Sequence, residues 1–208
     1  MIRGARTELL ITALFLIAMA HTIWRLQDNF HTVLPHRLFR SAQLSPAHLQ
    51  AHVELNGIRT IINLRGRNQD EAWYVNERAG AQTLGIEHID LPIDSFLPTP
   101  DEMLLLASTL AKCRGPVLLH CQSGIDRTGI ASALALLALD DASTPEQALD
   151  QLSWRFGSLP GRQSLARKKN FIAGYKTWLH HEGRTHSRAA FSDWLNQVTK
   201  MPEPWERE

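Results

Sequence analysis

Apolar residues along this chain fall into short β-branched or aliphatic runs that alternate with longer segments of helical length. The short runs are bounded by turn signals and are too short for helices, so each is suited to a buried strand. The strand candidates are residues 38–41, 58–64, 86–91 and 117–119, and the helix candidates are residues 46–55, 70–84, 100–112, 127–139 and a helix that starts at 145. This alternation predicts an α/β domain over residues 37–160, with a mostly parallel central sheet flanked by helices.

Capping residues support the predicted helix ends. Ser45 and Thr99 each precede a proline, so a hydroxyl can cap the helix while the proline occupies its first turn. Gly57 and Gly85 follow the last apolar positions of two helices, where a glycine tolerates the left-handed conformation that ends a helix. These signals place loops between every predicted strand and helix.

The chain from residue 161 onward has helical periodicity only. Phe171 and Tyr175 lie on the apolar face of one predicted helix, and Phe191 and Trp194 lie on that of a second. Aromatic residues at this spacing usually pack in a core. Residues 161–208 are therefore expected to form a C-terminal helical extension packed on the domain.

The first 24 residues differ from the rest in containing a long, nearly uninterrupted apolar run. Arg3 and Arg6 precede an apolar run over residues 9–20, which extends to Trp24. The run is short for a membrane span, which needs about 20 apolar residues, and it fits the hydrophobic region of a signal sequence. Residues 1–24 are expected to be a cleaved signal sequence or a retained membrane anchor, with a buried helix as the third interpretation.

The charges around this segment bear on location. A basic N-terminal flank favours a cytoplasmic N-terminus and a catalytic domain on the other side of the membrane. Residues 25–36 form a polar linker in this interpretation. We therefore expect a cell-envelope protein that is anchored in the inner membrane, periplasmic or exported, with membrane association through residues 9–24.

The composition excludes several classes of partner. A net charge of +1 at pH 7 indicates no general attraction to nucleic acid. The two cysteines, Cys113 and Cys121, are too few for a disulfide framework and lack the paired spacing of a metal site. We expect no metal and no cofactor.

One segment carries the chemistry. His120 to Gly129 reads His-Cys-Gln-Ser-Gly-Ile-Asp-Arg-Thr-Gly and lies between a predicted strand and a predicted helix. Backbone N–H groups of such a loop, together with the positive end of the helix, would bind a phosphoryl group and lower the pKa of Cys121. Arg127 can place a bidentate fork on two phosphate oxygens, and Thr128 can donate to the sulfur. The predicted loop comprises His120, Gln122, Ser123, Gly124, Ile125 and Asp126, around the candidate catalytic residues Cys121, Arg127 and Thr128.

The pattern His-Cys-x5-Arg-Thr-Gly resembles the signature of the cysteine-based protein tyrosine and dual-specificity phosphatase superfamily. Residues 35–156 are similar to the small atypical dual-specificity members. The resemblance implies a dual-specificity phosphatase-like fold and hydrolysis through a phosphocysteine at Cys121.

Such a reaction needs an acid to protonate the leaving oxygen. The segment Pro92 to Pro98 follows a predicted strand and is similar to the mobile acid loop of that superfamily. Asp94 lies four residues before Pro98, as the resemblance requires. Asp94 is the candidate acid, and Asp90 is its competitor.

Three arginines follow the ends of predicted strands, where ligands bind in an open α/β sheet. Arg40, Arg65 and Arg67 would form a positive rim for an anionic substrate. Alternatively they pair with carboxylates such as Glu71 or Asp126.

The loop's own side chains bear on the substrate. Gln122, Ser123 and Ile125 are uncharged, so a highly charged inositol phosphate would find only Arg127 within the loop. We therefore favour phosphotyrosine or phosphoprotein substrates with dual specificity. The alternatives are a phosphoinositide or other phospholipid head group and, in a different class, a phosphopeptide-binding pseudophosphatase.

Overall fold

A five-stranded sheet forms the centre of the domain in this computed structural model, which describes residues 12–17, 19 and 28–200. The strand order is β1-β2-β5-β3-β4. Strand β1 pairs antiparallel with β2, and all other neighbours are parallel. The strands are β1 (His31–Leu34), β2 (Leu38–Ser41), β3 (Thr60–Asn63), β4 (Glu87–Asp90) and β5 (Val117–His120). The mostly parallel sheet predicted from the apolar runs is confirmed.

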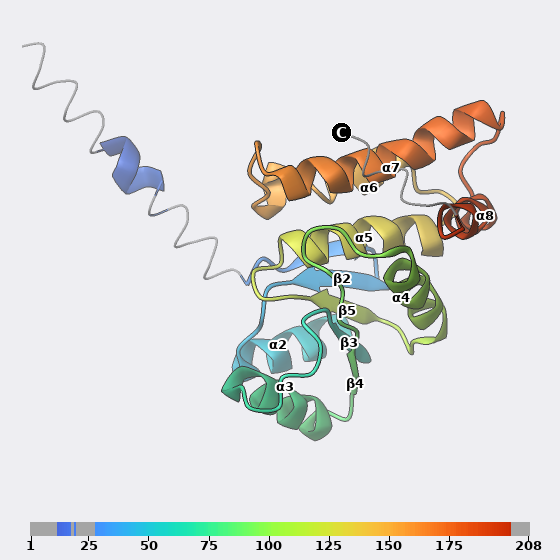
Figure 1. Ribbon diagram of the computed structural model, residues 1–208. Helices are drawn as coiled ribbons and strands as arrows, with labels where there is room; N and C mark the ends of the chain where they lie inside the picture. Colours follow the sequence, from blue (N-terminus) through green and yellow to red (C-terminus); the bar gives the residue numbers. More distant parts are fainter. Residues whose placement is uncertain (1–11, 18, 20–27, 201–208) are drawn as a thin grey trace, which may run out of the picture.

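Helices cover both faces of the sheet (Figure 1). Helices α2 and α3 lie on one face, and α4 and α5 lie on the other. Helices α6, α7 and α8 and the short 3-10 helix η1 complete the α4–α5 side, where α6 and α7 lie on the outer side of α5. The bounds are α2 (Pro46–Asn56), α3 (Ala72–Thr83), α4 (Pro100–Lys112), α5 (Asp126–Leu139), α6 (Pro145–Asp150), η1 (Trp154–Phe156), α7 (Gln163–His181) and α8 (Arg188–Val198).

The predicted capping residues form the contacts expected of them. The Ser45 hydroxyl accepts from the His48 amide, and Gly57 ends α2 with a φ of 66°. Thr99 and Glu102 form a reciprocal capping box at the start of α4. A lost cap costs about 1 kcal/mol, so these residues define where the helices begin.

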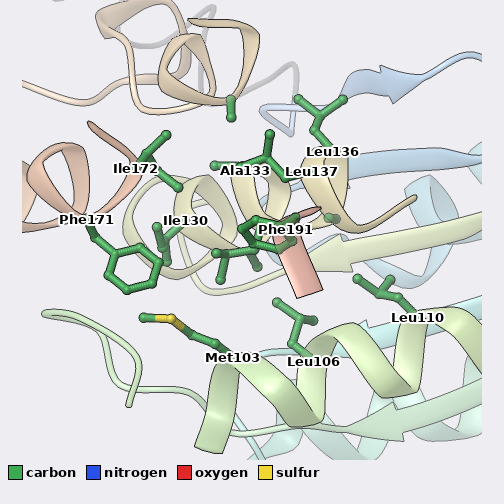
Figure 2. Close-up of a cluster of buried hydrophobic side chains, with 14 of the residues drawn as sticks. Met103, Leu106, Leu110, Ile130, Ala133, Leu136, Leu137, Phe171, Ile172 and Phe191 are labelled. Atoms are coloured by element: carbon green, nitrogen blue, oxygen red, sulfur yellow. The ribbon is translucent and has the colours of Figure 1, made fainter. Parts of the chain in front are cut away.

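Helix α5 is the centre of the larger core (Figure 2). Its residues from Thr128 to Leu137 are all buried, because the sheet, α4, α6, α7 and α8 contact different sides of it. Met103 of α4, Phe171 of α7 and Phe191 of α8 pack around it. Burial of each such side chain contributes about 1.5–3 kcal/mol to the stability of the fold. The helix that begins directly after the candidate catalytic loop is therefore held from all sides.

Strand β1 corrects the predicted linker. Residues 31–34 were expected in a polar connector over 25–36, but they pair with β2 at the edge of the sheet. Only Leu34 of this strand is buried, since an edge strand has solvent on one side. Four residues with one buried position leave too weak an apolar pattern to predict a strand.

The apolar N-terminal segment is only partly described. Residues 12–17 are helical, and Leu14, Phe15 and Ile17 are each more than 60% exposed. No helix within the described residues is long and apolar enough to cross a membrane. The remainder of the predicted signal or anchor, residues 1–24, lies outside the described residues, as do residues 201–208 of the predicted C-terminal extension.

Candidate active site

The candidate catalytic loop, residues 120–126, joins the end of β5 to the start of α5. Strands β2, β3 and β4 run parallel to β5, so the segments that follow them meet at the same edge of the sheet. Ser41 ends β2, Asn63 ends β3 and Asp90 ends β4. This edge brings the loop together with residues up to 95 positions away in sequence.

Cys121 lies buried inside the loop, with 3% of its surface exposed. Burial alone would raise the pKa of the thiol, but hydrogen bonds from the Thr128 hydroxyl and from the amides of Thr128, Ser123 and Gly124 lower it below its usual value. The buried Thr128 hydroxyl has no hydrogen-bond partner of normal geometry in the described chain, so it is uncommitted and can serve the sulfur. A thiolate in this setting is a ready nucleophile.

The loop amides face the sulfur because other residues hold the loop carbonyls outward. The Gln43 amide donates to the Gln122 carbonyl at 3.2 Å, and the Asn29 side chain donates to the Ser123 carbonyl at 3.1 Å. The C=O and N–H of a trans peptide point in opposite directions. Anchoring these two carbonyls therefore turns the amides of Ser123 and Gly124 toward Cys121.

Gly124 is required by the close approach of the loop to β2. Its φ is +70°, and a Cβ at this position would come within 2.8 Å of the Ser41 backbone. Only glycine meets both conditions without moving the backbone.

The position of Arg40 contradicts its predicted place in the substrate rim. It is fully buried and donates to the Gly124 carbonyl at 2.8 Å and to the Gln151 carbonyl at 2.8 Å. Its guanidinium lies 4.0 Å from the centre of the Phe156 ring. All four residues of β2 are buried, so a side chain of this strand cannot reach a substrate rim. Arg40 supports the loop from behind, through carbonyls rather than through a carboxylate.

Arg65 lies close to the loop. Its guanidinium stacks 3.4 Å from the Trp73 ring centre and donates to Gln43 Oε1 at 3.0 Å. Partial burial lowers the pKa of Arg65, the nearby Arg127 charge lowers it further, and the Cys121 thiolate opposes both. Two guanidiniums thus stand near the sulfur, an arrangement suited to a dianionic phosphate.

Two other predicted arginines, Arg127 and Arg67, have side chains that a ligand could reach. Arg127 is half-buried, and its only hydrogen bond within the described chain is a long one of 3.5 Å to the Leu64 carbonyl. Its fork therefore remains available to a ligand. Arg67 is exposed beyond the end of β3, as a rim residue would be.

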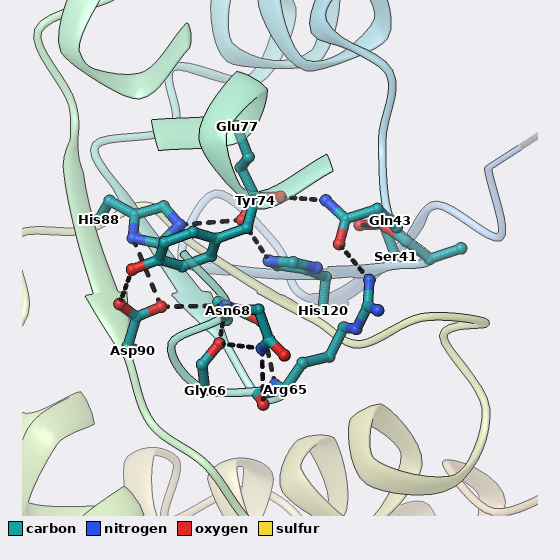
Figure 3. Close-up of polar contacts among 12 residues, drawn as sticks. Ser41, Gln43, Arg65, Gly66, Asn68, Tyr74, Glu77, His88, Asp90 and His120 are labelled. Carbon is teal, nitrogen blue, oxygen red and sulfur yellow. Dashed lines mark hydrogen bonds and ion pairs between the residues drawn. The ribbon is translucent and has the colours of Figure 1, made fainter. Parts of the chain in front are cut away.

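A buried glutamate on α3 supports the loop at its other end (Figure 3). Glu77 pairs with His120 at 3.2 Å and with His88 at 2.9 Å, and it accepts a hydrogen bond from the side-chain amide of Gln43. Burial alone would raise the pKa of Glu77, but the two histidines lower it to about 2. The carboxylate therefore stays charged and fixes His120, the residue before the candidate nucleophile.

The two candidate acids occupy different environments. Asp90 accepts from the Tyr74 hydroxyl at 2.5 Å and from the Asn63 side chain at 2.9 Å (Figure 3). Asp94 is exposed, and its Oδ1 accepts from the Phe96 and Leu97 amides at 2.6 and 3.1 Å. These contacts leave Oδ2 of Asp94 without a partner in the described chain. The geometry favours Asp94 as the proton donor, because Asp90 is committed to contacts within the fold.

Sequence reasoning did not single out Asn29, Gln43, Glu77 and Lys168. A signal existed for two of them. Glu77 lies on the helix face that carries the buried Tyr74 and Ala81, and Lys168 lies on the buried face of α7. A charged residue on an apolar helix face is rarely buried without a specific partner.

The outward anchoring of the loop can be tested at Asn29. We expect Asn29→Gly to raise the pKa of Cys121 by about half a unit to one unit, since the Gly124 amide would no longer be held toward the sulfur. Glycine keeps the native φ of 47° accessible. The measurement is the pH dependence of alkylation by iodoacetamide. Asn196→Ala on α8, whose amide donates to Ser192 far from the site, is the matched control. An unshifted profile in Asn29→Gly would show that the amides hold their direction without this anchor.

A mostly parallel sheet is followed here by an amide-lined loop that contains a cysteine of lowered pKa, with an arginine directly after the loop. This combination is typical of cysteine-based phosphatases. Residues 19–164 match the family model described as "DSP-PTPase phosphatase fused to NAD+ Kinase". The chain belongs to this family, within the PTP/DSP superfamily of cysteine-based phosphatases.

Solved structures share the fold. TpbA of P. aeruginosa is 23% identical with a TM-score of 0.55, over 71% of this chain and 88% of TpbA. The core catalytic domain of the PP-IP phosphatase SIW14 from S. cerevisiae is 16% identical with a TM-score of 0.56, over 84% of this chain and 95% of that domain. PTPMT1 is 16% identical with a TM-score of 0.51, over 71% and 98%. No curated protein sequence matches the chain.

Proposed function

We propose that this phosphatase hydrolyses phosphotyrosine and other phosphoprotein monoesters, with Cys121 as nucleophile and Asp94 as general acid. The observation that carries the proposal is the buried Cys121 thiol, whose pKa is lowered by the Thr128 hydroxyl and by the amides of Thr128, Ser123 and Gly124 against the effect of burial. Those amides are also the groups that would bind phosphate oxygens.

The proposed reaction has two steps. The Cys121 thiolate attacks phosphorus, the bond to the leaving oxygen breaks, and Asp94 gives that oxygen its proton. Arg127 and the loop amides hold the equatorial oxygens as charge redistributes. Asp94 then takes a proton from water, whose oxygen attacks the phosphocysteine. Phosphate leaves, and the Thr128 hydroxyl stabilises the released thiolate.

Two features of the site favour phosphotyrosine. Phe96 lies two residues after Asp94 and is 37% exposed, so the acid loop offers an aromatic surface beside the site. The loop residues Gln122, Ser123 and Ile125 add no positive charge for a polyphosphate. A variant of TpbA was solved in complex with pTyr, which shows that a protein of similar fold accepts this group.

A phospholipid head group is the second candidate, because of where the N-terminal segment joins the fold. The apolar run ends at Trp24, and only five residues later Asn29 is buried and bonded to the catalytic loop. Five residues span at most about 17 Å. If residues 9–24 associate with a membrane, the site lies close to its surface. We accordingly propose a cell-envelope location for the protein, anchored or exported.

A substrate panel tests this proposal on the full chain. We expect phosphotyrosine peptides to give the highest kcat/KM, with phosphoserine peptides, phosphoinositides and phosphatidylglycerophosphate in mixed micelles at least about 10-fold lower. Phosphate release is the measurement, and Cys121→Ser is the blank. Faster turnover of a lipid would replace the first candidate by the second. Peptide binding without turnover would indicate a pseudophosphatase.

A further inference from the structure

We infer that Lys168 of helix α7 is a positioning residue that holds the acid loop, residues 92–98, against the catalytic loop. This role rests on the proposed phosphatase mechanism and gives the C-terminal helix a part in it. Lys168 lies 42 positions after Asp126 and 73 after Ser95 in sequence, and it contacts both.

The contacts of Lys168 connect the two loops directly. Its Nζ donates to the Ser95 carbonyl at 2.7 Å and pairs with Asp126 Oδ1 at 3.2 Å. Ser95 follows the candidate acid Asp94, and Asp126 precedes the phosphate-binding Arg127. One ammonium group therefore fixes the main chain beside the proton donor relative to the loop that would hold the phosphate.

The ammonium group of Lys168 is carried on an otherwise apolar helix face. The Lys168 side chain is only 1% exposed, and it shares the buried face of α7 with Leu165, Ile172 and Tyr175. A hydrophobic residue of similar size could fill this volume, and replacement of both partners of a buried ion pair by hydrophobic residues is often neutral or stabilising. The lysine is thus better explained by the loops that it contacts than by stability.

The charges that act on Lys168 come from residues of the candidate site. Burial lowers the pKa of Lys168, while the charges of Asp126, Cys121 and Asp94 raise it. All three are candidate site residues. The ammonium therefore stands within electrostatic reach of both the nucleophile and the acid.

Neighbouring residues of the same chain segment contact the same two loops. The Arg167 guanidinium lies 4.9 Å from the centre of the Phe96 ring in the acid loop. Arg162, just before α7, approaches Asp126 Oδ2 at 3.5 Å. Both are more exposed than Lys168, so they add to an attachment of which Lys168 is the buried centre.

This attachment matters because proton transfer requires hydrogen-bond distance between the acid and the leaving oxygen. Asp94 is already fixed within its loop by the Phe96 and Leu97 amides, so a movement of the loop carries the carboxyl with it. A misplacement of about 1 Å can cost about 100-fold in rate. Loss of Lys168 should therefore act through Asp94.

The test compares leaving groups in the full-length protein. We expect Lys168→Met to lower kcat for phenyl phosphate by about 10- to 100-fold, with KM changed by less than about 3-fold, and to leave 2,4-dinitrophenyl phosphate nearly unaffected. Lys168→Gln, which keeps a donor but not the charge, should lie between wild type and Lys168→Met. Lys169→Met replaces the exposed neighbouring lysine and should behave as wild type.

A double-mutant cycle decides whether Lys168 acts through the acid. In an Asp94→Asn background, Lys168→Met should lower the phenyl phosphate rate by no more than about 2-fold further. An undiminished further loss would overturn the inference, and so would an equal loss for both leaving groups or failure of both Lys168 variants to fold. The proposed function fails separately, if Cys121→Ser retains turnover.

Discussion

Replacement of Cys121 by serine is expected to lower aryl phosphate turnover by about four orders of magnitude or more. The loop amides and Thr128 lower the pKa of a thiol, but they cannot ionise a hydroxyl to a comparable extent. Serine is close to cysteine in size, so the amide-lined loop should stay intact. We therefore expect Cys121→Ser to retain binding of a phosphate-like anion such as vanadate while turnover of p-nitrophenyl phosphate disappears.

Cys113 provides the matched control for this experiment. It is the other free cysteine, it lies at the end of α4, and burial raises its pKa to about 11. A thiol of this pKa is protonated at neutral pH and is a poor nucleophile. Cys113→Ser should keep wild-type turnover. If activity survives in Cys121→Ser and disappears in Cys113→Ser, the nucleophile is Cys113 and the proposed site is wrong.

Replacement of Asp94 by alanine is expected to have the second-largest effect. Without a proton donor, a poor leaving group such as phenolate must depart as an anion, so kcat for phenyl phosphate should fall by about 10²- to 10⁴-fold. An activated group such as 2,4-dinitrophenolate departs without protonation, and its rate should fall by less than about 10-fold. The measurement is kcat across a series of aryl phosphates, plotted against the pKa of the leaving phenol.

Asp90→Asn is the comparison that distinguishes the two acids. Asp90 holds Tyr74 and Asn63, so we expect its substitution to lower the thermal unfolding temperature while the leaving-group dependence stays that of wild type. A steeper leaving-group dependence in Asp90→Asn than in Asp94→Ala would assign the acid to Asp90.

The fold was predictable because its signals are local. Runs such as 58–64 and 117–119 are short, rich in Ile, Val and Leu and bounded by turns, which is the pattern of a central parallel strand. Caps such as Ser45 and Thr99 define helix starts within four residues of chain. The edge strand β1 was missed because half of its surface faces solvent, and an exposed face carries no apolar pattern.

The candidate nucleophile and phosphate-binding arginine were predictable for the same reason. Cys121, Arg127 and Thr128 belong to one segment of eight residues, so their spacing alone brings them together. Arg40 shows the limit of that reasoning. Its place at the end of a predicted strand suggested a rim, but whether a strand end is open or covered depends on the segment around Phe156, which packs over it from more than a hundred residues away.

The sequence by itself thus determined the class of fold and the segment that carries the candidate nucleophile and the candidate phosphate-binding arginine, since both follow from contacts between near neighbours in the chain. Only the tertiary structure decided how that loop is held. Asn29 holds a carbonyl of the loop, and Glu77 holds its first residue, His120. Lys168 attaches the acid loop to the catalytic loop. These residues lie 40 or more positions from the groups they hold, and the packing of sheet and helices alone brings them within hydrogen-bond distance.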